Sequence, residues 1–315
     1  MKNYHYKTFE SSNLYASPWA EYAEVITGLV LEEGITNIGQ YAFYECKNIT
    51  EISIPSTVKS IEKGAFIRCT GLSGLLIFPD GIKSIGDSAF LGCTGLSGNL
   101  VLPEGIETIG ESAFSGCTGF TGNLIIPDSV IKLGGAAFKN CSGFDGSLYI
   151  GRGLQIMTRE VFFGCTGLSG TVYFSENINY IADLAFKNCG INEYYFVGDA
   201  PEVSPSDDYY PSFDSSDKIY YPLTNSTWMI ENRKWNGYNA SYYFSGTMGD
   251  INGDGMVDVK DAYMARLIAA KIYEPTKAEI ILGDVDGDGR ITAIDANLIR
   301  KFAVEMISDF PVERA

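Results

Sequence analysis

The chain has 315 residues, of which 39 are acidic and 23 are basic, so its formal net charge at neutral pH is −16. This balance argues against binding to nucleic acid or to an anionic membrane surface, because both begin with Lys and Arg side chains that neutralise phosphates. No stretch approaches the roughly 18 consecutive apolar residues of a membrane-spanning helix. Only one histidine, His5, is present, so a Ser–His pair, a Cys–His pair or a histidine-bound zinc enzyme is not expected.

Seven cysteines mark an internal repeat. Their spacing is 23 residues once and 24 residues five times, and each cysteine lies three positions after a phenylalanine. They are Cys46, Cys69, Cys93, Cys117, Cys141, Cys165 and Cys189. A unit of this length is too short to bury its own apolar face, so stacked units must share one core, as in a solenoid. The odd count and even spacing argue against disulfides, and we expect the thiols to form a buried internal ladder.

A short strand with the pattern L-x-L ends most repeats, and its phase predicts an exposed surface. The outer residues of each triplet should face the core and the middle residue should point outwards. The middle residues are Val30, Ser53, Ile77, Val101, Ile125, Tyr149, Tyr173, Tyr195 and Tyr220. Eight steps of about 4.8 Å would give a stripe about 40 Å long. Its four tyrosines are a candidate site for sugar rings or a protein, unless they serve only as good strand formers.

The repeat has an I-x-x-I-G-x-x-A-F approach and a C-x-G-L-x-G-x-L-x-L-P exit, and it resembles the BspA-like leucine-rich repeats of bacterial surface and secreted proteins. The resemblance covers about residues 20–245. It includes the entry motif SPWAEYAEVITGLVL and a closing segment, KIYYPLTNSTW to RKWNGY, that looks like the usual end cap. This resemblance implies a scaffold for binding, but such scaffolds take ligands that vary.

After Phe244 the repeat stops, and two copies of another pattern follow 34 residues apart. Residues 250–261 read DINGDGMVDVKD and residues 284–295 read DVDGDGRITAID. Each matches a calcium loop with oxygen ligands at positions 1, 3, 5, 7, 9 and 12 and glycine at position 6. The expected ligands are Asp250, Asn252, Asp254, the Met256 carbonyl, Asp258 and Asp261, then Asp284, Asp286, Asp288, the Arg290 carbonyl, Thr292 and Asp295. We expect two Ca²⁺ ions with a structural role, because protein oxygens fill these positions and the pattern includes no base or nucleophile.

The duplicated loop-and-helix pattern resembles a type I dockerin of cellulosomes over about residues 248–312, with helices predicted at 261–272 and 295–306. Position 12 is Asp, where an EF-hand has Glu. The resemblance implies a cohesin module of a scaffoldin as partner, recognised at loop positions 10 and 11 and about two turns into each helix. Those residues are Val259, Lys260, Arg266 and Leu267, then Ala293, Ile294, Arg300 and Lys301. The Ser/Thr pair common at positions 10 and 11 is missing from both copies, which predicts a more apolar interface.

We therefore predict a mixed fold: an entry segment at 1–23, a leucine-rich-repeat solenoid of short parallel strands at 24–245, and a small all-α dockerin at 246–315. The predicted function is non-catalytic recruitment to a cellulosome outside the cell, with the repeats displayed to a polysaccharide or a cell-surface protein. The N-terminus has no apolar core typical of a signal peptide, so a secreted chain would be the mature form. Two alternatives stay open: a structural spacer, and a carbohydrate-active hydrolase, although regular repeats leave little room for its paired carboxylates. No catalytic residue is predicted.

Overall fold

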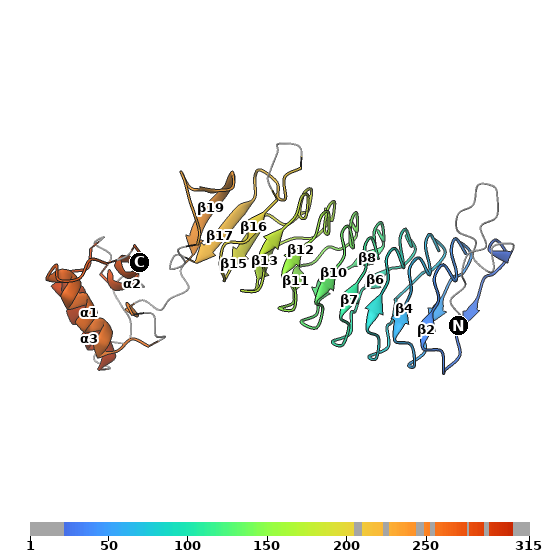
Figure 1. Cartoon of the computed structure of the whole chain (residues 1–315), viewed down its shortest axis with the longest axis horizontal. Helices are drawn as coiled ribbons and strands as arrows, with labels where there is room; N and C mark the ends of the chain where they lie inside the picture. The colour runs from blue at the N-terminus through green and yellow to red at the C-terminus, as the bar shows by residue number, and fades with distance from the viewer. Residues whose placement is uncertain are drawn as a thin grey trace. The chain divides into compact units, whose positions relative to one another are not determined.

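The computed structural model describes residues 22–204, 210–222, 227–243, 249–252, 256–275, 277–286 and 290–304. Within these ranges the chain forms two compact units. The first comprises the chain up to Tyr221 together with Thr227–Ser241, and the second comprises Pro222 and the chain from Tyr242 onwards. In Figure 1 the first unit runs from blue to orange and the second is the helical part in darker orange and red.

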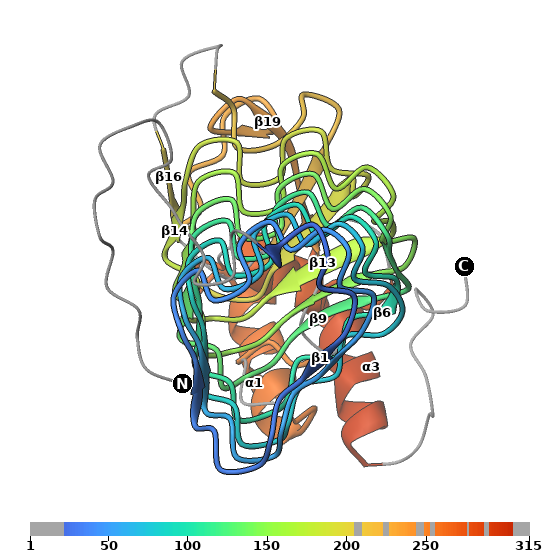
Figure 2. The ribbon, with the colours of Figure 1, turned by 90° about the vertical axis from the view of Figure 1, so that its right-hand side faces the viewer.

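The first unit is a solenoid in which successive turns stack one behind another, as the end-on view of Figure 2 shows. One ladder consists of two-residue strands, each of which ends at the second isoleucine of the I-x-x-I-G approach or at the equivalent residue. Neighbouring strands in this ladder are parallel. It contains a five-stranded and a three-stranded sheet. The five strands are β2 (Asn37–Ile38), β4 (Ser60–Ile61), β5 (Ser84–Ile85), β7 (Thr108–Ile109) and β10 (Lys132–Leu133), and the three are β12 (Ile156–Met157), β14 (Tyr180–Ile181) and β16 (Glu202–Val203).

A second ladder contains the L-x-L strands. Its first part consists of separate parallel pairs, and its last part is a five-stranded sheet that ends in an antiparallel pair. The pairs are β1 (Leu29–Val30) with β3 (Ile52–Ser53) and β9 (Leu124–Ile126) with β11 (Leu148–Ile150), and β6 (Gly98–Asn99) with β8 (Phe120–Thr121) is a further pair. The sheet contains β13 (Thr171–Phe174), β15 (Glu193–Phe196), β17 (Lys218–Pro222), β19 (Tyr238–Tyr243) and β18 (Lys234–Trp235).

The core between these ladders is a stack of aromatic rings lined by thiols. The repeat phenylalanines from Phe43 to Phe186 stack on one another with ring centroids 5.2–5.9 Å apart. All seven cysteines are buried and free. From Cys69 to Cys165, each Sγ donates to the carbonyl oxygen of the phenylalanine in the preceding repeat at 2.9–3.1 Å. The predicted thiol ladder is therefore confirmed, and burial, which raises the pKa of Cys93 to about 12, keeps the thiols in the unreactive protonated form.

The glycine two residues after the cysteine lies where the backbones of adjacent repeats come close together. A Cβ on Gly119 would collide with the backbone carbonyl oxygen of Leu96, and one on Gly95 would collide with that of Leu72. No side chain fits in such a position, because the atom it meets belongs to backbone and cannot turn away. The C-x-G spacing thus sets how closely the turns of the solenoid stack.

The described residues of the second unit form three helices: α1 (Val259–Ala269), α2 (Lys277–Gly283) and α3 (Ala293–Ala303). The predicted helices at 261–272 and 295–306 were placed too late, because both begin two residues earlier and end three residues earlier. Helix α2 lies in the connecting segment and was not predicted. A small apolar cluster joins α1 to α3, and it contains Ile251, Ala262, Ala265, Ile268, Val285, Ile291, Ala296 and Ile299. No helix in the described ranges is long and apolar enough to span a membrane.

One buried carboxylate makes the stability of the solenoid depend on pH. Asp217 is 2 % exposed near the last turns, and its Oδ2 accepts a hydrogen bond from the backbone N–H of Asp214 at 2.8 Å. Burial raises the pKa of Asp217 to about 6 from its ordinary value of 3.8. The folded chain therefore holds a proton that the unfolded chain releases between these two pH values.

We predict that the free energy of unfolding of the solenoid falls by about 2–3 kcal/mol as the pH rises from 4 to above 6, and stays flat beyond that. In Asp217→Asn the buried group is neutral at every pH and can still accept the Asp214 N–H, so this fall should disappear. Urea unfolding of both proteins at pH 4, 5, 6 and 7 measures the difference. Parallel pH curves for the two proteins would contradict the prediction.

Candidate functional site

The second loop of the helical unit is held by one aspartate at its last position. Asp295 is fully buried in the first turn of α3. Its Oδ1 accepts from the backbone N–H groups of Val285 at 3.0 Å and Asp286 at 3.2 Å, and its Oδ2 accepts from the N–H of Thr292 at 2.8 Å. One carboxylate thus ties the beginning of the loop to its end.

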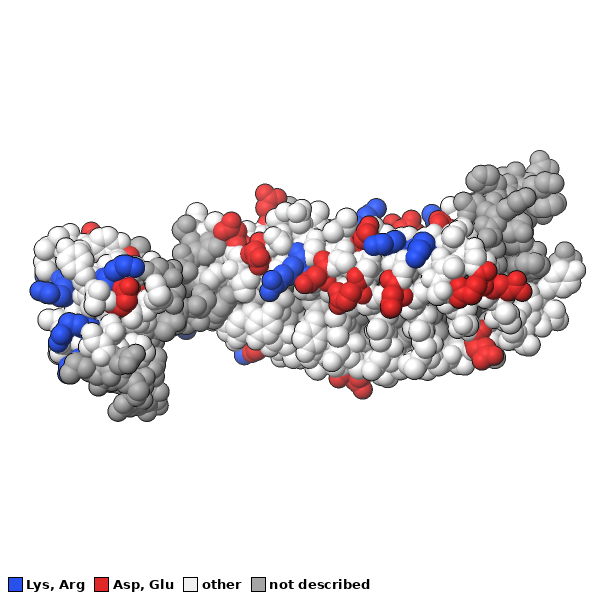
Figure 3. All heavy atoms as spheres, turned by 90° about the horizontal axis from the view of Figure 1, so that it is seen from below, with Lys and Arg blue, Asp and Glu red and all other residues white. Residues whose placement is uncertain are grey.

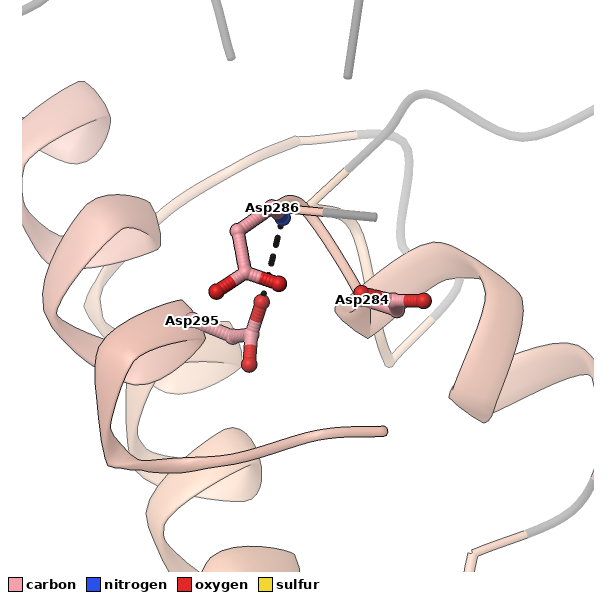
Figure 4. Close-up of side chains that lie close together, drawn as sticks. All are labelled: Asp284, Asp286 and Asp295. Atoms are coloured by element: carbon pink, nitrogen blue, oxygen red, sulfur yellow. Dashed lines mark hydrogen bonds between the residues drawn. The ribbon is translucent and has the colours of Figure 1, made fainter. Parts of the chain in front are cut away.

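Three carboxylates converge in this loop. Oxygen atoms of Asp284, Asp286 and Asp295 all lie within 4.8 Å of one another, and Figure 4 shows the side chains of Asp286 and Asp295 pointing toward one another. Like charges at this separation repel, and a cation among them would relieve the repulsion. A set of oxygen donors alone, on a flexible loop, fits a hard cation such as Ca²⁺.

The first loop repeats the arrangement 34 residues earlier. Asp261 is fully buried and Asp250 nearly so. The Oδ1 of Asp261 accepts from the N–H of Asn252 at 3.1 Å, and its Oδ2 accepts from the N–H of Asp258 at 2.8 Å. Burial raises the pKa of Asp261, and the carboxylate of Asp250 adds to the rise. A cation held between the two carboxylates would reverse this effect and favour their ionised form.

Position 9 of each loop has a structural task that the sequence analysis missed. Asp258 and Thr292 are the N-cap residues of α1 and α3, and their side chains accept from the N–H groups of Lys260 at 2.7 Å and Ile294 at 3.1 Å. The aspartate at position 12 completes a capping box with each of them. The [S/T/D]-x-x-[D/E] spacing before a helix was the signal for this cap, and it explains why both helices begin earlier than predicted.

The other predicted ligands are placed less completely. Asp254 and Asp288 lie outside the described residues. The side chains of Met256 and Arg290 are exposed, which leaves the predicted role to their backbone carbonyls.

We predict that Asp286→Asn weakens Ca²⁺ binding by the second loop but does not lower the melting temperature of the helical unit in EDTA. The substitution removes a carboxylate from the cluster, and without a cation this relieves repulsion. Asp295→Asn is the contrasting variant, because it disturbs the backbone hydrogen bonds and should lower the melting temperature in both buffers. Calorimetric titration with CaCl₂ and thermal unfolding measure the two effects. Equal losses in EDTA for both variants would show that the cluster is a hydrogen-bond network only.

The residues predicted to contact a cohesin lie on α1 and α3. On α1, Val259, Lys260 and Arg266 are exposed and Leu267 is half-buried; on α3, Ala293, Ile294 and Arg300 are exposed and Lys301 is half-buried. The structure brings three of them together around one groove of about 460 Å³, namely Arg266, Ala293 and Arg300. The sequence analysis missed the other lining residues, which are Ala269, Ala270, Ala296 and Asn297. They lie at the end of α1 and at the beginning of α3, so nothing in the sequence pattern indicates that they are close together.

The middle residues of the L-x-L strands point outwards, as their phase predicts. Tyr149 is 54 % and Tyr173 is 62 % exposed, and the aliphatic members of the stripe are exposed as well. Tyr195 and Tyr220 are half-buried because their rings stack on each other at 4.2 Å between centroids. The open aromatic surface is therefore narrower than the four predicted tyrosines, and Tyr149 and Tyr173 line a hollow of about 290 Å³.

A row of carboxylates accompanies the stripe along the solenoid. From Val30 to Tyr173, the residue three positions after each stripe residue is exposed, and five of these seven residues are acidic. They are Glu33, Asp80, Glu104, Asp128 and Glu176, with Arg152 as the single basic exception in this run. Figure 3 shows acidic residues following one another along the solenoid. The stripe is thus an apolar and aromatic surface beside an acidic margin.

Comparison with protein families assigns both units. The model of the BspA type leucine-rich repeat region (6 copies) matches residues 21–145 and 83–206, which together cover more than half of the chain. The chain belongs to this family. The dockerin type I domain matches residues 248–303, so the predicted solenoid and dockerin are both confirmed. These two families are binding and assembly modules.

Among solved structures, the leucine-rich-repeat protein TpLRR of T. pallidum is 28% identical with a TM-score of 0.46, over 52% of this chain and 76% of that chain. A leucine-rich repeat protein from Bacteroides ovatus is 23% identical with a TM-score of 0.44, over 69% and 68%. The ScaB dockerin in complex with the third cohesin of ScaC, from Acetivibrio cellulolyticus, is 32% identical with a TM-score of 0.22, over 22% and 100%. No curated protein matches the chain.

Proposed function

We propose that this protein is a non-catalytic component of a cellulosome, outside the cell, in which the dockerin binds a scaffoldin cohesin and the repeats present a surface to a second ligand. The observation that carries the proposal is the repeated carboxylate arrangement before α1 and α3, inside the stretch that matches the dockerin type I domain. Two such loops, each closed by its position-12 aspartate, set the directions from which two exposed helices meet a partner.

Calcium would be held by the carboxylates of the two loops, with two structural ions in all, and it would supply charge neutralisation there. The chain's own residues do the rest. Asp261 and Asp295 hold the loop backbones, while Asp258 and Thr292 fix the first turns of α1 and α3. Side chains such as Ile294, which is 61 % exposed, then remain outside for contact with a cohesin.

For the repeats we propose a ligand surface centred on Tyr149 and Tyr173. Two open aromatic rings beside a hollow give flat apolar area with hydroxyl groups, which suits a sugar chain or an aromatic-rich protein surface. Binding is favoured over hydrolysis because the described carboxylates of this face follow one exposed row. Glycoside hydrolysis needs two carboxylates facing each other across a cleft, at a separation of about 5–10 Å.

We predict that the intact protein binds a type I cohesin in CaCl₂ and releases it in EDTA, while the solenoid stays folded in both buffers. The reason is that calcium holds only the loops, whereas the solenoid has an apolar core of its own. Calorimetry against a panel of purified cohesins, including the third ScaC cohesin of Acetivibrio cellulolyticus, measures the binding, and near-ultraviolet circular dichroism follows the solenoid. Binding that persists in EDTA would contradict the proposal, and so would a panel in which no cohesin binds.

We predict that Tyr149→Ala/Tyr173→Ala lowers affinity for the ligand of the repeats by about tenfold or more, because two stacking rings are lost. Affinity electrophoresis in gels containing soluble xylan or mixed-linkage glucan, and pull-down from a cell-wall protein extract in EDTA, provide the measurement. Ile131→Ala/Ile156→Ala removes two exposed apolar side chains elsewhere on the solenoid and serves as the control. Equal behaviour of the two double variants would contradict a tyrosine site and favour the spacer.

A further inference from the structure

The helical unit contains two copies of one loop-and-helix pattern, so α1 and α3 can be compared residue by residue. We call two residues twins when they occupy equivalent positions of the two copies, 34 residues apart. The groove of about 460 Å³ lies between the end of α1 and the beginning of α3, and it extends along α3 to Arg300. Four of its seven lining positions have the same residue type in the twin copy: Arg266 and Arg300, which are twins of each other, Ala269 with twin Ala303, and Ala296 with twin Ala262. Both ends of the helix pair thus share the same arginines and alanines.

The remaining three lining positions differ, and all differ in the same direction. The groove has Ala270, Ala293 and Asn297 where the twin set has the larger residues Val304, Val259 and Tyr263. These larger side chains are exposed, by 48 %, 61 % and 61 % respectively. One end of the helix pair is therefore hollow, and the equivalent positions at the other end carry bulk that stands out into solvent.

The charge around the groove indicates what fills it. Outside the eight carboxylates assigned to the calcium loops, residues 248–304 carry seven basic side chains and two acidic ones, and Figure 3 shows mainly basic residues on the visible face of this unit. Arg266 and Arg300 both line the groove. The Nη2 of Arg300 donates to the Oδ1 of Asn297 at 3.2 Å, which holds this guanidinium beside the groove. Guanidinium groups have N–H donors in a planar fork that matches a carboxylate.

We infer that this groove receives a carboxylate side chain of the cohesin, between Arg266 and Arg300, and that it fixes a single orientation of the partner on the dockerin. The inference rests on the proposed binding of a cohesin. A partner bound in the second orientation, rotated so that α1 and α3 exchange roles, would place its carboxylate at the other end of the helix pair. There Val304 and Tyr263 occupy the positions equivalent to Ala270 and Asn297, so the second orientation is blocked. Both loops then contribute to folding of the helical unit, while only one end of the helix pair contributes to recognition of the cohesin.

The test exchanges the two ends of the helix pair. Ala270→Val/Asn297→Tyr fills the groove with the residues of its twin, and Val304→Ala/Tyr263→Asn is the matched control that empties the other end. Each introduced residue already occurs at the equivalent helical position of the other copy, so both variants should fold. The readout is calorimetric affinity, in CaCl₂, for the cohesin that binds the intact protein, together with the melting temperature of each variant without cohesin.

We expect the groove-filling variant to lose affinity by about tenfold or more, and the control to stay within about twofold of the intact protein. If the cohesin bound in two equivalent orientations, the groove-filling variant would lose one of the two and its affinity would fall by only about twofold. This result would overturn the inference. A melting temperature that falls in the groove-filling variant without cohesin would also overturn it, because the groove would then be occupied by the chain itself.

The arginine pair has a separate test. Arg300→Gln should lower affinity for the cohesin and flatten its dependence on salt concentration, because a charged contact is screened by ions. Lys271→Gln removes an exposed charge that does not line the groove and should leave both quantities unchanged. Equal effects of the two substitutions would contradict the carboxylate assignment. If no cohesin of the panel binds the intact protein in calcium, the proposed function itself fails, and the groove loses its partner with it.

Discussion

The helical unit depends on the crowding of carboxylates at the start of two helices. In each loop the position-12 aspartate is buried and accepts backbone N–H groups from both ends of the loop, and other carboxylates lie close by. The like charges of such a cluster repel one another, and a bound cation would relieve this repulsion. The same aspartate completes the capping box, so one side chain sets both the geometry of the carboxylate cluster and the direction of the helix.

The solenoid obeys a different constraint. Its turns are held by stacked phenylalanine rings, by thiols that donate to the backbone of the preceding repeat, and by glycines that allow close approach. None of these interactions involves a cation, so the display surface should persist when the dockerin is unfolded by chelation. This separation is what the proposed function requires, with attachment by the dockerin and display by the repeats.

The sequence predicted the features that follow directly from its periods. The burial of the cysteines and the outward phase of Tyr149 and Tyr173 followed from a repeat of constant length, and the loops followed from alternating aspartates. The starts of α1 and α3 were predicted wrongly, because Asp258 and Thr292 were assigned to calcium alone while they also cap helices. The stacking of Tyr195 on Tyr220 depends on ring rotation, which a pattern does not encode.

The groove was beyond prediction for another reason. Its lining residues come from the end of α1 and from α3 as far as Arg300, so their proximity depends on how α1 packs against α3. Once this packing is known, the duplicated sequence becomes informative again, because each lining residue can be compared with its twin. Small residues at one end and large residues at the other are then visible as an asymmetry with a consequence for binding.

Hydrogen exchange of the intact protein with and without Ca²⁺ tests the central claim most directly, namely that a cation organises the helical unit alone. The amides that donate to Asp295 and Asp261, among them those of Val285, Thr292 and Asp258, should exchange much more slowly in calcium, together with α1 and α3. Exchange in the repeats, residues 46–189, should not change. Equal exchange of the loops in both buffers, or an equal response of the repeats, would contradict the account.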